Sequence, residues 1–438
     1  MSGRRVILIT NARLFDPASG LDEPGSILFE AHRDTRDGVI LALGAEVKAP
    51  KDAEVVDAQG ALVCPGLIDL RAVIGEPGAE HRETYKSAGR AAAAGGVTTL
   101  VQMPNTDPVI DDVSLVDFVV RRASSRTDVR ILPAAAMTRG LNGEMMTEMG
   151  LLTEAGAVFF SNGDRSVSDS RVMRRALAYA SAFGALVAHR PEDSTLSPGG
   201  AMHEGELSAR LGISAIAAAA EVIMLERDLA LAELTGARLL VDLVSAAGSM
   251  DSLRRAKARG VKVSASVSVH HLALNENDVA GYRTFAKLSP PLRGEQDRRA
   301  LIEGLSEGLI DVIVSGHDPR PAEDKRLPFD EASFGASALE TLLPGALQVV
   351  HAGEASLRTV LGAMTANPAA LLGLAQGRLA AGAPADVILV DLGFPLKFNA
   401  DAMVSKSKNS PFDGRLMQGR CLRTYVGGRL AFAADGSL

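Results

Sequence analysis

Two histidines of this chain follow strand-like runs, where an imidazole can serve as a zinc ligand or as an acid–base group. His189 comes directly after the run 185–188, and His317 comes just after the run 311–315. A metal centre needs several converging ligands, and a single histidine rarely holds zinc. We therefore interpret His189 as a buried, hydrogen-bonded side chain and His317 as a packing or hydrogen-bonding residue.

Asp318 lies two residues after Gly316, so both would face the same side of an extended chain. Its carboxylate could act as a base, but Pro319 follows and the strand is expected to have ended there. His203 stands in a predicted loop, where it could contact a ligand.

Arg71 is a permanent cation close to the end of a predicted strand. An unpaired buried cation would be expensive, so Arg71 needs a carboxylate partner. Glu76, close by in the sequence, and Asp242, if its side chain turns inward, are the two candidates.

The composition bounds the class of protein. The 438 residues are 47% hydrophobic and 23% charged, with a formal net charge of −7, so a basic nucleic-acid-binding surface is not expected. The two cysteines, Cys64 and Cys421, form no pair motif and fit a reducing compartment. Because no run of ~18 apolar residues occurs, no membrane span is expected. The pattern favours a soluble cytoplasmic protein that binds neither nucleic acid nor membrane.

The pattern of strands and helices predicts the fold that positions these residues. Short β-rich runs separated by Asp, Gly and Pro clusters occupy both ends, for example at 6–9, 26–29, 386–391 and 422–426. Between them strand-like and helical runs alternate, over a length that suits a (β/α)8 barrel with its chemistry at the C-terminal ends of the strands. We predict an α/β chain with a TIM-like (β/α)8 barrel at 64–372. A small β-sandwich formed by both termini would comprise 1–63 plus 373–438.

Ordered motifs along almost the whole chain resemble one known family. They include Pro65-Gly66-Leu67-Ile68-Asp69-Leu70, Met103-Pro104-Asn105-Thr106-Asp107-Pro108, Gly199-Gly200-Ala201-Met202-His203-Glu204-Gly205, Ser289-Pro290-Pro291-Leu292-Arg293 and Asn367-Pro368-Ala369. In these segments the chain is similar to the long-chain form of the dihydroorotase family, in the amidohydrolase superfamily. The resemblance implies a TIM-like barrel carrying a β-sandwich built from both termini, which is the fold predicted above from the pattern.

The resemblance also implies metal chemistry, in which a divalent ion activates water and polarises a cyclic amide. At the family's positions, however, Arg71 and Val73 replace a His-x-His pair, and Leu243 replaces a later histidine ligand. Gly316 replaces the general acid/base aspartate, and Gly75 replaces an arginine that binds the substrate carboxylate. We therefore expect no catalytic residues at these positions, no bound zinc and no other cofactor.

Some of the family's substrate pocket remains in the sequence. Asn105 is retained, His189 stands at a ligand position, and His317 keeps its place beside the missing aspartate. Ser289 replaces a substrate-binding asparagine. The pair at 270–271 matches a family segment that is not used as a ligand, so we interpret it as structural.

These observations favour a non-catalytic, dihydroorotase-like protein of pyrimidine biosynthesis, and not an enzyme. The resemblance is to the inactive subunits that associate with aspartate carbamoyltransferase, so the expected partner is that enzyme's catalytic chain, with a homodimer inside a larger complex. Two alternatives stay open. One is an active dihydroorotase or other cyclic amidohydrolase with a rebuilt site. The other is a metal-free barrel that binds a pyrimidine-pathway ligand through Asn105, Arg71 and Arg320.

Overall fold

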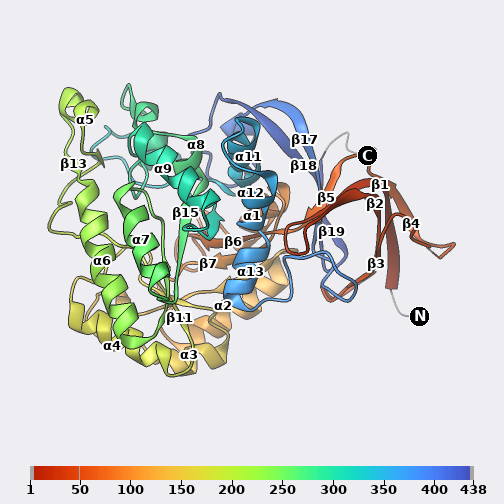
Figure 1. The fold of residues 1–438 in the computed structure, drawn as a ribbon, viewed down its shortest axis with the longest axis horizontal. Helices are drawn as coiled ribbons and strands as arrows, with labels where there is room; N and C mark the ends of the chain where they lie inside the picture. The colour runs from red at the N-terminus through yellow and green to blue at the C-terminus, as the bar shows by residue number, and fades with distance from the viewer. Residues whose placement is uncertain (1–3, 49, 435–438) are drawn as a thin grey trace.

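The computed structural model describes residues 4–48 and 50–434 and contains a barrel beside a β-rich domain (Figure 1). Neighbouring barrel strands run parallel, and a bridge between Ala72 and His317 joins the last strand to the first. In order these strands are β6 (Leu67–Ala72), β7 (Val97–Gln102), β8 (Arg130–Pro133) continued by β9 (Ala135–Ala136), β10 (Phe160–Ser161), β11 (Leu186–His189), β14 (Arg238–Val241), β15 (Val263–Ser268) and β16 (Val312–Val314).

Helices cover the outside of the barrel. Some begin where a side chain satisfies the free backbone N–H groups, as Asp112 does before α2 and Asp169 before α4. The helices include α1 (Tyr85–Ala94), α2 (Val113–Arg126), α3 (Met149–Ala155), α4 (Ser170–Ser181), α6 (Ala218–Thr235), α7 (Gly248–Ala258), α8 (Val269–Ala273), α9 (Glu295–Ser306), α10 (Ala322–Lys325), α11 (Leu342–His351), α12 (Leu357–Gly362) and α13 (Ala366–Leu372).

Both ends of the chain meet in the β-rich domain, where red and blue strands lie side by side in Figure 1. Its strands are β1 (Arg4–Asp16), β2 (Leu21–His32), β3 (Ile40–Gly44), β4 (Glu54–Asp57), β5 (Leu62–Pro65), β17 (Val387–Lys397), β18 (Leu416–Val426) and β19 (Arg429–Ala433). β17 pairs antiparallel with β5, which joins the C-terminal strands to the N-terminal ones. The predicted fold class is thus confirmed, while the boundaries 1–63 plus 373–438 and 64–372 stay a prediction.

The barrel interior is a layer of apolar side chains below the mouth. Alternate residues of the strands point inward, and Ile68, Leu70, Val101, Leu240 and Val314 belong to one buried cluster. This packed layer closes the lower barrel, so polar side chains at the C-terminal ends of the strands are presented at one mouth.

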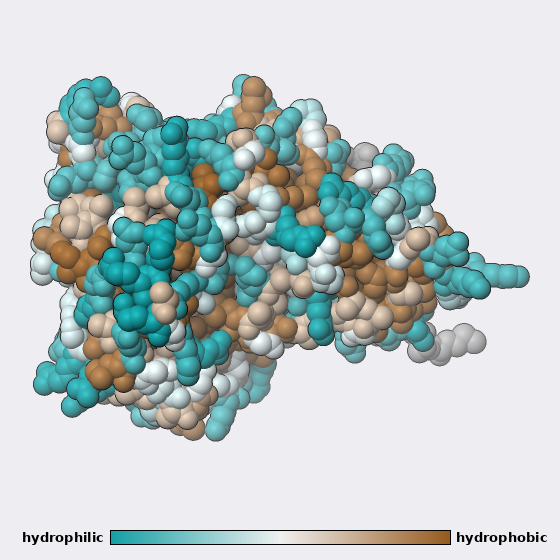
Figure 2. All heavy atoms as spheres, in the orientation of Figure 1, coloured by the Kyte–Doolittle hydropathy of each residue, from teal (hydrophilic) through white to brown (hydrophobic). Residues whose placement is uncertain are grey.

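On the face shown in Figure 2, hydrophilic residues alternate with scattered apolar patches. Among the more exposed apolar side chains are Leu416 on β18 and Leu234 on α6. In the part of the chain that the structure describes, no helix has both the length and the apolar character needed to cross a membrane.

Candidate active site

The centre of the barrel mouth is the Arg71 guanidinium, which is 3% exposed. Its Nε donates to Asp242 Oδ2 at 2.8 Å, and its Nη2 donates to Asp164 Oδ1 at 2.6 Å. Asp242 is therefore the carboxylate partner of Arg71, whereas Glu76 accepts from Arg122 instead. The buried cation is compensated by charges carried on two other strands of the barrel.

Asp164 shares its Oδ1 between two buried cations, because Arg190 Nη1 also approaches it, at 3.3 Å. Burial raises the pKa of Asp164, but the charges of Arg71 and Arg190 outweigh it, so the pKa lies below its usual value. Asp164 therefore carries a negative charge at neutral pH and ties the end of β10 to the ends of β6 and β11.

Two expected metal-ligand positions lie in apolar surroundings. Val73 and Leu243 are 8% and 3% exposed and belong to the same buried cluster as the barrel's inner layer. The backbone at Gly75 leaves no room for an arginine, because an ideal Cβ there would lie 2.1 Å from the carbonyl oxygen of Ala79. A side chain at position 75 would therefore require the loop after β6 to move.

Gly316 has a left-handed backbone with φ of 65°. An ideal Cβ would lie 3.1 Å from Ser268 Cβ and 3.7 Å from His270 Nδ1. An aspartate at this position would strain the backbone and press on Ser268.

His189 is buried, and both of its ring nitrogens are already paired. Nδ1 donates to Asp228 Oδ2 at 2.6 Å, and Nε2 accepts from the backbone N–H of Val167 at 2.8 Å. The lone pair that would bind a metal is occupied, which is the arrangement favoured from the sequence.

His317 is fully buried, and its Nδ1 accepts from the backbone N–H of Ala338 at 3.0 Å. Its Nε2 lies 3.7 Å from Glu83 Oε2, beyond hydrogen-bonding range. Burial lowers the pKa of His317 to about 3, so the ring is neutral. His317 packs between the barrel and the β17–β18 connection.

Other predicted residues lie around this centre. His203 is half-buried and ends a two-residue strand, β12 (Met202–His203), so the predicted loop is wrong at this position; Arg293 Nη1 approaches its Nδ1 at 3.3 Å. Ser289 is half-buried in the segment after Lys287. His271 is held by Ser268 Oγ and the Pro291 carbonyl.

Unpaired polar atoms gather on one side of the mouth. Asp318 Oδ1, Arg320 Nε and Asn105 Oδ1 are all buried and have no hydrogen-bond partner within the described residues. Arg320 Nη2 donates to the other oxygen of Asp318 at 2.6 Å, which fixes the two side chains together. Burial raises the pKa of Asp318 above its usual value in spite of Arg320. Buried unpaired groups are uncommon in native proteins, and each calls for a partner such as a bound molecule or a water.

A loop at 319–336 lies over this side and is held by two buried lysines. Lys325 Nζ donates to the carbonyl oxygens of Thr284 and Ser333, and Lys287 Nζ donates to those of Phe329 and Asp330. These hydrogen bonds tie the loop to the segment that precedes Ser289.

The β-rich domain also reaches the mouth, through the connection between β17 and β18. Asn409 accepts from the backbone N–H of Arg320 at 3.1 Å and donates to the Gly335 carbonyl at 3.0 Å. The position of the Asp318–Arg320 pair therefore depends on both domains.

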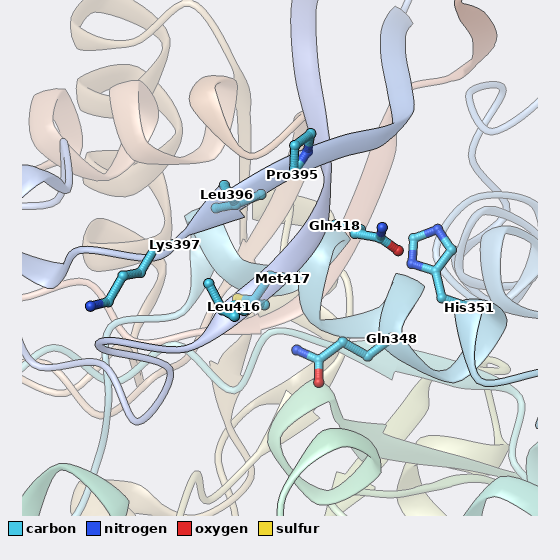
Figure 3. Close-up of a pocket in the computed structure, with 8 residues that line it drawn as sticks. All are labelled: Gln348, His351, Pro395, Leu396, Lys397, Leu416, Met417 and Gln418. Carbon is cyan, nitrogen blue, oxygen red and sulfur yellow. The ribbon is translucent and has the colours of Figure 1, made fainter.

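A separate groove of about 600 Å³ lies between α11 and the β17–β18 hairpin (Figure 3). It is lined by Gln348, His351, Pro395, Leu396, Lys397, Leu416, Met417 and Gln418. This lining contains no carboxylate and none of the barrel-mouth residues, so we place the candidate active site at the mouth and not in this groove.

Comparison with known proteins points to the same family as the sequence motifs. The family model described as "Dihydro-orotase-like" matches residues 60–249. A protein named Dihydroorotase from Anaeromyxobacter sp. (strain K) is 42% identical over 427 residues, covering 97% of this chain and 97% of its own. The chain belongs to the dihydroorotase family. Another member of this name, from Geobacter metallireducens, is 40% identical and covers 97% of this chain and 99% of its own.

Solved structures show the same architecture. The L-hydantoinase (dihydropyrimidinase) from Arthrobacter aurescens superposes with a TM-score of 0.87 at 26% identity, covering 100% of this chain and 98% of its own. The dihydropyrimidinase from Brevibacillus agri NCHU1002 has a TM-score of 0.83 at 20% identity, covering 97% and 94%, and supports the fold alone.

These comparisons correct three of our expectations. Full-length relatives that carry the enzyme name contradict a non-catalytic scaffold, and they contradict the prediction that the chain is not an enzyme. The expectation of no cofactor is wrong as well, because the chain belongs to a family that uses a divalent metal. All three expectations rested on motif residues that this chain lacks. They gave no weight to the polar groups that the fold brings together at the mouth.

The residues at the mouth nevertheless do not fit the family's metal centre. Arg71, Val73, Leu243 and Gly316 offer no ligand atom, and His189 has its lone pair in use. Among residues 4–48 and 50–434, no three His, Cys, Asp or Glu side chains are grouped so as to hold a metal ion. The site is rebuilt around an arginine.

Sequence reasoning missed three charged residues of this site. Asp164, Arg190 and Asp228 were not among the predicted site residues. A signal was available for two of them, because Arg190 directly follows β11 and Asp164 comes shortly after β10. Charged residues at the C-terminal ends of barrel strands are candidates for the mouth.

Proposed function

We propose that this chain is a cyclic amidohydrolase that binds a dihydroorotate-like ring at the barrel mouth and opens or closes its amide bond. Relatives named Dihydroorotase at 42% identity over 97% of the chain support the substrate class. The retained Asn105 and the charged groups around Arg71 support the location.

The observation that carries the proposal is the pairing of Asp318 and Arg320. Asp318 Oδ1 is an unused acceptor, and Arg320 Nε–H is an unused donor, on side chains that already share a hydrogen bond. The edge of a cyclic amide presents an N–H beside a carbonyl oxygen, which is the complementary pattern. Because an unpaired buried polar group costs about 1–3 kcal/mol, a ring that satisfies both groups is favoured.

Asn105 supplies a further contact on the same side. Its Oδ1 has no partner, and its Cγ lies 3.5 Å from the ideal Cβ position of Gly163, beside Asp164. The amide can accept from a ring N–H through Oδ1 or donate to a carboxylate through Nδ2. This suits a ring that carries both kinds of group.

Ring opening adds one water across the amide bond, the oxygen going to the carbonyl carbon and a proton to the nitrogen as the C–N bond breaks. Negative charge develops on the carbonyl oxygen, and a fixed donor that points at this oxygen stabilises the transition state. In this chain Arg320 Nε–H would be that donor. Asp318 would accept from the N–H of the substrate ring and so orient the ring.

The test measures ring opening of L-dihydroorotate and ring closure of N-carbamoyl-L-aspartate, on protein purified without chelator, with and without added zinc. We expect turnover by the wild type and at least about a tenfold higher KM for Asp318→Ala, equivalent to ~1.4 kcal/mol. Glu323→Gln changes an exposed carboxylate of the same loop and should leave KM unchanged. A wild type that neither turns over nor binds the ring contradicts the proposal.

We also propose, on the resemblance alone, that the chain associates with an aspartate carbamoyltransferase catalytic chain and forms a homodimer within that complex. A cytoplasmic location goes with this partner.

A further inference from the structure

His270 lies inside the barrel mouth, on α8, directly after β15. It is 2% exposed, and its Nε2 is a buried polar atom without a hydrogen-bond partner among the described residues. Its Nδ1 lies 3.7 Å from the ideal Cβ position of Gly316. The imidazole therefore lies in van der Waals contact with the position that a Cβ at residue 316 would take.

The neighbouring histidines differ from His270 in their hydrogen bonds. His271 has both nitrogens within reach of partners, Ser268 Oγ at 2.9 Å and the Pro291 carbonyl at 3.2 Å. His317 uses Nδ1 to accept from a backbone N–H. Neither ring has the free acceptor that a proton transfer at position 316 requires, whereas His270 does.

The ring of His270 is fixed by its surroundings. It stacks on Phe412, with centroids 5.6 Å apart and planes inclined by 26°. Burial lowers the pKa of His270 to about 3, with His271 and His317 adding to the effect, so the ring is neutral near pH 7. With its hydrogen on Nε2, the Nδ1 lone pair is the acceptor that faces Gly316.

We propose that His270 is a catalytic proton-transfer residue that replaces the side chain missing at Gly316. The inference rests on the proposed function. In ring opening, Nδ1 takes a proton from the attacking water while the water oxygen bonds to the carbonyl carbon. The C–N bond then breaks, the nitrogen receives the proton from Nδ1, and the imidazole returns to its neutral form. The net change is the addition of one water to the ring.

The test compares His270→Phe and His270→Asn with the wild type. Phe keeps the stack on Phe412 without ring nitrogens, and Asn keeps polarity without the imidazole. Acid–base groups contribute roughly 10²–10⁴-fold, so we expect kcat to fall at least about 100-fold in both variants. Binding of orotate, a planar analogue of the ring, should stay within about threefold, because the proposed ring contacts are elsewhere.

His351→Phe is the matched control, since His351 lines the groove beside α11 and should leave kcat unchanged. Thermal melting of each variant shows whether it folds, and His270→Asn serves if His270→Phe does not. An active wild type together with a His270→Phe as fast as His351→Phe overturns this inference and leaves the proposed function standing. A wild type that neither binds orotate nor turns over contradicts the proposed function itself.

Discussion

Arg71 combines two properties that seldom occur together in a protein interior: a permanent charge and a position deep in a barrel. Its side chain is 3% exposed, and Asp242 is 4% exposed. Bringing such a pair out of water is costly, and the attraction between the charges repays that cost only when the geometry and the hydrogen bonds are good. Here two carboxylates on different strands accept from one guanidinium, so the pair also fixes the relative positions of those strand ends.

We expect Arg71→Met to lower the free energy of unfolding by about 3–5 kcal/mol, because it leaves buried Asp242 without its counter-charge. The control is Arg121→Met, which removes a cation that is 79% exposed and paired with Asp117 on α2. This change should lower stability by less than about 1 kcal/mol. Denaturant unfolding measures both variants.

A second substitution tests whether the unpaired charge of Asp242 causes this loss of stability. Adding Asp242→Asn to Arg71→Met removes the stranded charge and should restore part of the lost stability. Equal losses in Arg71→Met and Arg121→Met would show that the buried pair contributes no more than a surface pair.

Sequence patterns predicted some of the residues at the mouth, but not which residues they contact. Arg71 had two candidate partners, and the strand pattern alone could not choose between Glu76 and Asp242. Asp242 is the partner because it directly follows β14 and its side chain reaches Arg71, whereas Glu76 lies in the turn after β6 and accepts from Arg122 on α2. Contacts across a barrel join residues far apart in sequence, and no local pattern encodes them.

At the scale of elements, two buried lysines hold the loop 319–336. Lys325 and Lys287 are 3% and 2% exposed, and their ammonium groups donate mainly to backbone carbonyls. Phe334 lies 4.7 Å from Lys287 Nζ and adds a cation–π contact. Because the acceptors are carbonyl oxygens, the hydrogen bonds that hold the loop depend on the protonation state of each lysine.

Burial lowers the pKa of Lys325 to about 7 from its ordinary 10.5, while Asp318 and Asp324 oppose the shift and Arg320 and Lys287 add to it. Between about pH 7 and pH 10.5, Lys325 therefore holds a proton in the unfolded chain and has lost it in the folded chain. The free energy of unfolding rises with pH across this range. The contribution of Lys325 is fully present above 10.5 and is lost as the pH falls through about 7.

We therefore expect the difference in unfolding free energy between wild type and Lys325→Met to shift by ~2 kcal/mol in favour of the wild type from pH 7.5 to pH 9.5. Denaturant unfolding at several pH values measures this difference. Lys262→Met, which changes an exposed lysine, is the control and should show little pH dependence. A pH-independent difference for Lys325→Met would mean that the lysine keeps its proton in the fold.

Regular elements were predictable because their patterns are local. The sequence alone indicates helical runs at about 216–234 and 171–182, and the structure has α6 (Ala218–Thr235) and α4 (Ser170–Ser181) there. It also indicates a strand at 238–243, which ends earlier, at Val241, because Leu243 takes a positive φ of 60°. That turn aims Asp242 at Arg71, and a propensity argument contains no information about it.

At the scale of the whole molecule, the β-rich domain is part of the active-site frame. The connection between β17 and β18 places Asn409 against Arg320 and Phe412 against His270. No local sequence pattern predicts this contact with the barrel mouth, because it joins residues about ninety positions or more apart. A partner bound to this domain would therefore be connected to the site through Asn409 and Phe412.

This arrangement makes the proposed partnership testable as a physical association. A stable complex with an aspartate carbamoyltransferase catalytic chain should bury more than ~1,000 Å² and form a closed, symmetric assembly. We expect the two chains, co-expressed, to elute together in size-exclusion chromatography at micromolar concentration, earlier than either chain alone. The matched reference is each chain expressed separately and then mixed. Separate elution under both conditions would rule out a permanent complex, while the ring-opening assay would still decide the activity of this chain independently.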